Sequence, residues 1–148
     1  DIEYHLQQCG YWQIPNVFLM ITCYPTETLD DHNKNVNDLR KYQKYSKAGV
    51  IEFMRWGTTM HIAPDTPISS KESVDALGLV TASGQDIFYE PGTSYTWKSK
   101  TNPDLDLRER IRRRLELYKV TTELGYLQPN ARNEITTILK MSEYINEN

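Results

Sequence analysis

The chain has 148 residues, of which 39% are hydrophobic and 25% are charged, and its formal net charge at pH 7 is −3. These values are typical of one globular domain with a buried core, and the negative charge excludes nucleic-acid binding over the whole surface, so any such binding needs a local basic patch. We expect a single domain over residues 1–148 and, because the chain begins at Asp1, we interpret it as a piece excised from a larger protein.

The first half of the sequence predicts three strands and one helix. Apolar and polar residues alternate over residues 2–6, as in a strand, and residues 17–24 form an apolar run typical of a well-buried strand. Acidic and amide side chains at 30–33 can cap a helix, and Gly49 can end it. A further strand is expected directly afterwards, over residues 50–56 (VIEFMRW).

The second half predicts short elements and then helices. Residues 64–76 are expected to form a long loop or a short helix, in which KESVDAL can make one or two turns. Three strand-like runs follow, LGLVTAS, DIFYE and SYTWKSK. Asp104 or Asp106 can cap a helix that ends at Gly125, and a second helix begins near Arg132. The predicted fold class is α+β or α/β, a mixed β-sheet flanked by helices with a C-terminal helical pair.

The stretch LDLRERIRRRLELYK, residues 105–119, concentrates arginine in an acidic chain. The residues expected to face the core are Leu107, Ile111, Leu115 and Tyr118. The arginines would then cover the remaining surface as a solvated face with salt bridges, a phosphate-binding surface, or a contact with a partner protein. The candidate nucleic-acid-binding residues are Trp97, Lys98, Lys100, Arg108, Arg110, Arg112, Arg113 and Arg114.

One series of residues in the last third carries a family resemblance. It comprises Tyr95, Thr96, Asp104, Arg108, Arg110, Ile111, Arg114, Leu115, Gly125, Glu134, Ile135, Thr136 and Lys140. This series resembles the C-terminal part of the endonuclease domain in the acidic polymerase subunit of influenza-type (orthomyxo-like) viruses. In addition, NVFLMITCYP, KYQKYSKAGV and IEF are similar to the strand–helix–strand core of PD-(D/E)xK nucleases.

The resemblance implies a nuclease-like fold that cuts a nucleic-acid backbone with two divalent metals, Mn²⁺ or Mg²⁺, held by carboxylates on adjacent strands. The strand over residues 17–24 has no carboxylate, and Asn16 follows Pro15 where an aspartate would be expected. We therefore predict a degenerate metal site, with no cofactor unless the domain is active.

A relocated active site is the alternative. Its candidate catalytic residues are His61, Asp65, Asp86, Glu90 and Lys98. Asp65, Asp86 and Glu90 would hold the metal. The competing interpretation is that these aspartates lie in turns and that the histidine is structural.

These observations predict a nuclease-like domain of a viral RNA polymerase subunit with a structural or RNA-guiding role. Its expected partners are RNA and either other polymerase subunits or a larger assembly. The alternatives are an active metal-dependent endonuclease that cuts single-stranded RNA, and a non-enzymatic module that docks an acidic partner through the arginine-rich helix. No apolar run is long enough to cross a bilayer. We expect no membrane partner, two free thiols at Cys9 and Cys23, and an intracellular location, nuclear or cytoplasmic, in the host cell of a virus.

Overall fold

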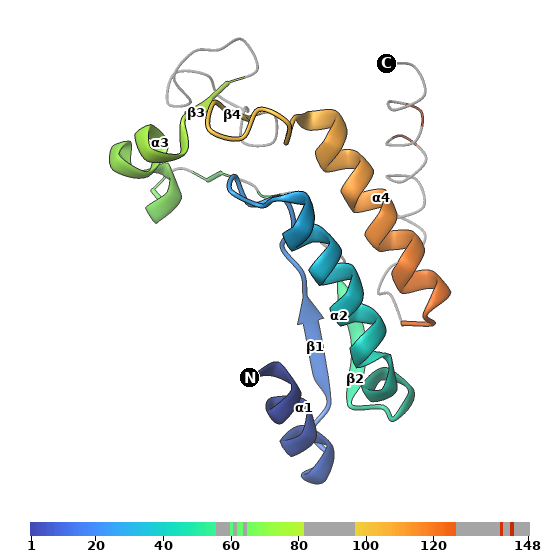
Figure 1. The fold of residues 1–148 in the computed structure, drawn as a ribbon. Coiled ribbons are helices and arrows are strands. Elements are labelled where there is room, and N and C mark those ends of the chain that lie inside the picture. Colours follow the sequence, from blue (N-terminus) through green and yellow to red (C-terminus); the bar gives the residue numbers. More distant parts are fainter. Residues whose placement is uncertain are drawn as a thin grey trace.

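The computed structural model describes residues 1–55, 60, 62–63, 65–81, 97–126, 140 and 143. In chain order its elements are α1 (Ile2–Tyr11), β1 (Asn16–Leu19), α2 (Leu29–Lys47), β2 (Ile51–Arg55), the 3₁₀ helix η1 (Pro67–Ser69), α3 (Lys71–Leu77), β3 (Leu79–Val80), β4 (Lys98–Ser99) and α4 (Leu107–Glu123) (Figure 1). β1 pairs with β2 in parallel and β3 pairs with β4 antiparallel. The prediction of a mixed α+β fold is confirmed.

The β1–α2–β2 unit is the part of the fold that the sequence predicts best. Thr28 and Asp31 form a reciprocal capping box at the start of α2, because each side chain accepts a hydrogen bond from the backbone N–H of the other residue. Gly49 follows the helix with φ +74°, a left-handed conformation that glycine adopts at little cost. The chain then returns as β2 alongside β1, as a parallel pair joined by a helix requires (Figure 1).

The prediction of a strand over residues 2–6 is wrong, because this segment is the helix α1. Its N-cap is Asp1, whose carboxylate accepts a hydrogen bond from Glu3 N at 2.9 Å. Leu6 and Cys9, three positions apart, are its buried residues, whereas Ile2 and Tyr4 are exposed. Glu3 also accepts from Lys41 Nζ and Lys44 Nζ at 2.7 and 2.9 Å, which holds α1 against α2.

The strand β1 is shorter than predicted and is covered on one face only. Phe18 and Met20 pack against the hydrophobic core, whereas Val17 and Leu19 between them are exposed. The expectation of a well-buried strand is therefore wrong for alternate residues. An apolar run alone does not distinguish a strand covered on both faces from one that leaves apolar side chains in contact with solvent.

Two hydrophobic clusters hold the described residues together. The larger one joins α1, α2, β2 and α4 and contains Leu6, Val36, Leu39, Tyr42, Ile51, Leu117, Val120 and Tyr126. The smaller one lies around α3, β3 and β4 and contains Cys23, Ile62, Val74, Leu79, Trp97 and Leu105. Cys9 and Cys23 are both free thiols, as predicted, and burial raises the pKa of Cys23 to about 11.

Other predictions are met in part. The short helix within residues 64–76 is present as α3, and α4 begins after its cap Asp106 and is followed by Gly125 at φ +75°. The DIFYE run lies outside the described residues, as does the second C-terminal helix except for Lys140 and Glu143. Over the part of the chain that is described, no helix combines the length and the apolar character needed to cross a membrane.

Candidate functional site

The helix α4 is rotated relative to the prediction. Its buried residues are Arg110, Ile111, Arg113, Leu117, Val120 and Thr121. Of the residues expected to face the core, only Ile111 is buried, and Leu107, Leu115 and Tyr118 are half-buried. Two arginines of the candidate phosphate-binding surface therefore point into the protein.

Arg110 is completely buried and contacts Trp97, which is also completely buried. Its guanidinium carbon lies 4.1 Å from the centroid of the Trp97 ring, and Nη2 donates to the Trp97 carbonyl oxygen at 2.7 Å. Trp97 in turn donates from Nε1 to Met60 O at 2.9 Å. The arginine thus joins α4 to the residue that precedes β4, through a cation–π contact and a charge-assisted hydrogen bond.

Arg113 forms a buried ion pair with Glu27. Its Nη1 donates to Glu27 Oε1 at 3.0 Å and to the carbonyl oxygens of Glu27 and Thr28, while Nε donates to Glu109 Oε1 at 2.8 Å. Glu27 is itself anchored, since Oε2 accepts from Cys23 N at 2.7 Å. These bonds attach the turn before α2 to the middle of α4.

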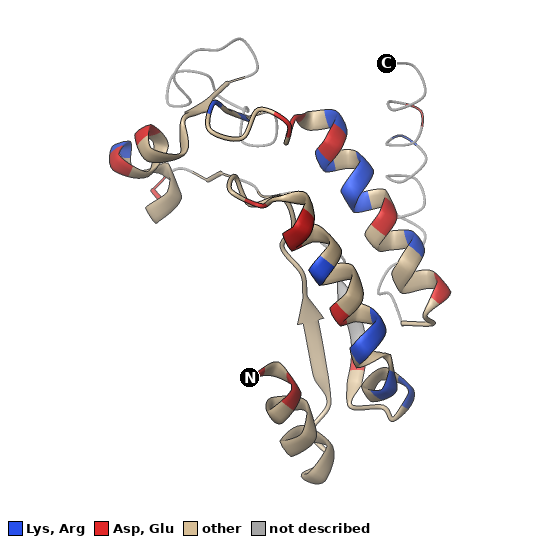
Figure 2. Ribbon diagram, in the orientation of Figure 1, with Lys and Arg blue, Asp and Glu red and all other residues tan. Residues whose placement is uncertain are grey.

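The prediction that the basic residues form one exposed surface is therefore wrong for Trp97, Arg110 and Arg113. Lys98, Lys100 and Arg108 are exposed, and Arg114 is half-buried. Arg112 is exposed but bridges two carboxylates, Glu109 at 2.6 Å and Glu116 at 3.1 Å. Figure 2 shows acidic and basic residues mixed along α4, so the net positive charge that this helix presents to a phosphate is small.

The acidic residue Glu109 gives this ion-pair network a defined pH dependence. Hydrogen bonds from Arg112 and then from Arg113 hold the pKa of Glu109 at about 2, below its ordinary value of 4.5. Because the pKa is lower in the folded state than in the unfolded state, this carboxylate stabilises the fold above pH 4.5, and its contribution is lost as the pH falls toward 2.

We expect the free energy of unfolding to fall across this window in the wild type and to fall less in Glu109→Gln, as measured by urea denaturation at several pH values. Ion pairs with Lys41 and Lys44 also lower the pKa of Glu3 to about 2. Glu3→Gln should therefore also reduce the dependence of the unfolding free energy on pH, independently of Glu109→Gln. Glu72→Gln, an exposed change on α3, is the matched control. An unchanged slope in Glu109→Gln would contradict the assignment.

The candidate nuclease residues are not brought together in the described part of the chain. Asp65 is exposed and lies in a turn before η1 with φ +60°, and Lys98 is exposed on β4. His61, Asp86 and Glu90 lie outside the described residues. Within the described ranges, no group of three or more His, Cys, Asp or Glu side chains is placed to hold a metal ion.

Sequence patterns did not predict the cluster formed by His5, Cys9 and Asn16. His5 Nε2 lies 3.5 Å from Cys9 Sγ and 2.9 Å from Asn16 Oδ1, and Cys9 Sγ lies 3.7 Å from the same oxygen. Residues four apart share a helix face, so the signal was present, but the predicted strand covered residues 2–6 only and did not include Cys9.

This cluster has the residue types of a cysteine nucleophile with its base, but not the required hydrogen bonds. Asn16 Nδ2 donates to Ile14 O at 3.0 Å, which directs Asn16 Oδ1 at both His5 and Cys9. The oxygen only accepts, so the tautomer that satisfies it carries hydrogen on Nε2, the nitrogen nearest the thiol. A base must present a bare nitrogen to the thiol, and we assign the cluster a structural role.

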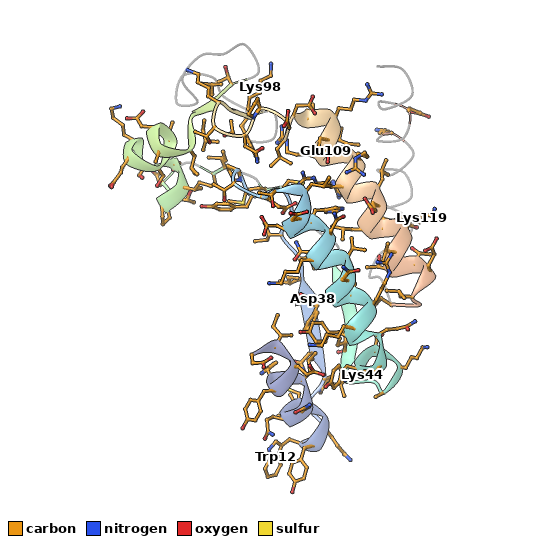
Figure 3. The ribbon with its side chains drawn as sticks, viewed as in Figure 1. Trp12, Asp38, Lys44, Lys98, Glu109 and Lys119 are labelled. Atoms are coloured by element: carbon orange, nitrogen blue, oxygen red, sulfur yellow. The ribbon has the colours of Figure 1, made fainter. Side chains whose placement is uncertain are left out.

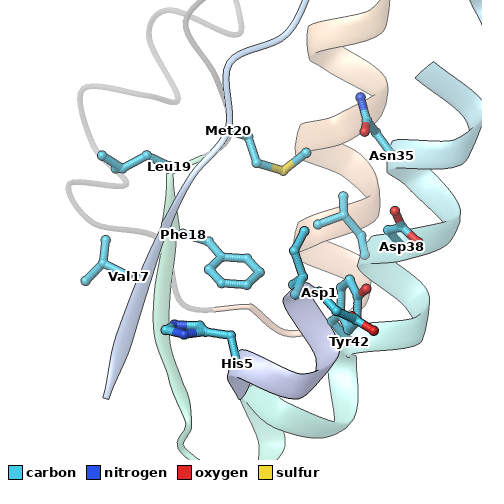
Figure 4. A pocket seen from close by; sticks show the side chains of 11 residues that line it. Asp1, His5, Val17, Phe18, Leu19, Met20, Asn35, Asp38 and Tyr42 are labelled. Atoms are coloured by element: carbon cyan, nitrogen blue, oxygen red, sulfur yellow. The ribbon is translucent and has the colours of Figure 1, made fainter. Parts of the chain in front are cut away.

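A pocket of about 600 Å³ lies between α1, β1 and α2 (Figure 4). Phe18 and Met20 point into it from β1 and the residue after it, while Tyr42 closes it from α2. Its polar lining residues are Asp1, His5, Asn35 and Asp38. The pocket is thus largely apolar and includes two carboxylates in its lining.

Comparison of the chain with protein-family models, with curated protein sequences and with solved structures finds no match. The assignment of a function therefore depends on the residues and geometry described above.

Proposed function

We propose that this chain is a nuclease-like domain of a viral RNA polymerase subunit, that its metal site is degenerate, and that its role is structural. In this proposal it binds other polymerase subunits through an apolar surface, and it neither cuts RNA nor guides it.

The observation that carries the proposal is the distribution of exposed apolar side chains. Where the structure describes side-chain exposure, the large hydrophobic side chains that are exposed all lie between residues 2 and 29. The most exposed include Tyr11, Trp12, Leu19 and Ile21, and Trp12 projects from the end of α1 (Figure 3). Exposed apolar side chains that form a contiguous surface typically mark a protein–protein contact, because burying them against a partner removes them from water. Ile2, Val17 and Leu19 are brought together in this way, since all three line one pocket.

Two further observations support a structural role. β1 carries no carboxylate, and Asn16 at its start uses its amide nitrogen to bond the backbone, so this strand has no hard oxygen ligand of the charged kind that Mn²⁺ and Mg²⁺ favour. The arginines that would bind RNA are used inside the fold at Arg110 and Arg113. The geometry thus favours subunit contact over RNA guidance.

We expect millimolar Mn²⁺ to leave the melting temperature unchanged and single-stranded RNA to remain intact, because a metal that binds only the folded state would have to stabilise it. The measurement is a thermal melt with and without Mn²⁺, followed by an RNA cleavage assay, on the wild type and on Asp65→Ala. A rise in melting temperature that disappears in Asp65→Ala would instead support the relocated active site. RNA binding that weakens steeply with salt, and that is lost in the triple variant Lys98→Ala, Lys100→Ala and Arg108→Ala, would support RNA guidance.

The subunit contact is tested by co-expression with the other subunits of the polymerase encoded alongside this chain. We expect the wild type to co-purify with them and the double variant Trp12→Ser and Leu19→Ser to do so poorly, because both side chains are exposed and contribute little to the fold of the free domain. The matched control is Thr122→Ser with Lys119→Ser, which changes exposed residues of α4.

A further inference from the structure

We infer that the pocket between α1, β1 and α2 docks a basic, amphipathic segment of a partner protein, which inserts an apolar side chain between Phe18 and Tyr42 and places a lysine or arginine beside Asp38. The inference rests on the proposed function, since it names the chemistry of the partner that the structural role requires.

The interior of the pocket fits an apolar side chain. Phe18 and Met20 line it from one side, and Leu39 and Tyr42 line it from α2. Its volume of about 600 Å³ exceeds that of any single side chain, so a segment can insert one large residue and part of a neighbour. Burial of one large apolar side chain contributes less free energy than association costs, so contacts outside the pocket must supply the rest of the affinity.

The edge of the pocket selects positive charge. Two of its lining residues, Asp1 and Asp38, are acidic, and none is lysine or arginine. The Asp1 carboxylate already caps α1, so Asp38 is the group that selects the charge. Two lysines of α2 lie one helical turn from Asp38. Lys41 is held by Glu3, and Lys34 is exposed and makes no ion pair with Asp38. Among the described residues, the Asp38 carboxylate has no hydrogen-bond or ion-pair partner, so a cation from outside would satisfy it without displacing another group.

The surroundings of the pocket favour a polypeptide segment over a small ligand. Ile2 and Leu19 both line the pocket, yet they are 53% and 69% exposed. A small molecule inside the pocket would leave the outer surface of these side chains in water. A segment that continues beyond the pocket would cover them, which is why we assign a partner protein as the occupant.

The test is a selection from a library of random peptides displayed on phage, with the intact chain as the bait. We expect the selected peptides to combine a large apolar residue with lysine or arginine, and their synthetic versions to lose about tenfold in affinity, or more, on Asp38→Lys. Asn35→Trp, at a half-buried position on the pocket edge, should abolish binding because the indole occupies the same space. Glu123→Lys makes the same change of charge at an exposed site of α4 and is expected to leave affinity unchanged.

Methionine methyl resonances locate the bound peptide directly. The chain has four methionines, and Met20 lines the pocket, so its resonance, assigned from Met20→Leu, should move on titration. Selection of acidic peptides, selection of none, or binding that survives Asn35→Trp would overturn the inference. The Mn²⁺ melt and the co-purification experiment test the proposed function separately, so a failure of peptide binding is distinguishable from a failure of the structural role.

Discussion

Arg113→Ala is expected to lower the free energy of unfolding by about 3–5 kcal/mol, because it leaves the buried carboxylate of Glu27 without its cation. Glu27 is 6% exposed and lies within the turn before α2, whereas Arg113 lies on α4. The variant also removes the donors to the carbonyl oxygens of Glu27 and Thr28. The attachment between α2 and α4 would therefore weaken as a unit.

Urea denaturation followed by circular dichroism measures this effect. Arg112→Ala is the matched control, since the Arg112 side chain is 46% exposed where that of Arg113 is 5% exposed, and its expected cost is below about 1 kcal/mol. Replacing both Arg113 and Glu27 by methionine should recover most of the loss, because no unpaired charge then remains buried. Equal effects of Arg112→Ala and Arg113→Ala would contradict the buried ion pair.

Arg110→Ala is expected to cost about 3 kcal/mol or more. It removes a desolvated cation–π contact with Trp97, leaves the Trp97 carbonyl oxygen without its donor, and opens a cavity between α4 and β4. Arg110→Lys should not restore stability, since an ammonium group lacks the planar guanidinium that lies over the indole and bonds the carbonyl at the same time.

The unfolding free energy of Arg110→Ala is compared with that of Arg108→Ala, an exposed arginine two residues earlier, whose expected effect is within about 0.5 kcal/mol. A loss as small in Arg110→Ala as in Arg108→Ala would show that the stacked pair contributes nothing to stability.

These expectations also affect the choice of variants for RNA-binding measurements. Substitution of Arg110 or Arg113 cannot test RNA binding, because it destabilises the fold. Substitution of Lys98, Lys100 and Arg108 can test it, because these side chains are exposed.

Several elements were predictable because their signals are local. α2 and α4 are long and are bounded by polar caps and by glycines, and each of these signals acts within a few residues of the helix end. The parallel pair β1 and β2 follows from two apolar runs separated by a helix. The lack of a carboxylate in β1 is likewise a property of the sequence alone.

The segment containing α1 was not predictable in the same way. Residues 2–6 are too few to distinguish the two-residue period of a strand from the 3.6-residue period of a helix, because Ile2 and Leu6, four positions apart, fit both. What selects the helix is its position on α2, through Leu6 in the core and Glu3 between two lysines. The cluster of His5, Cys9 and Asn16 was missed for the same reason, because it exists only when residues 5 and 9 lie on one helix face.

Local signals in the sequence were sufficient to predict the two long helices, the parallel strand pair and the absence of acidic ligands from β1, since caps, periodicity and residue type act over a few residues. The face of α4 that is buried depends instead on contacts made in the folded protein. Apolar periodicity directs arginine outward, but Glu27 and the Trp97 carbonyl, 86 and 13 positions away in the chain, provide buried partners that compensate the desolvation of Arg113 and Arg110. Residues so far apart in the chain meet only when the protein folds, so local sequence patterns do not predict these contacts.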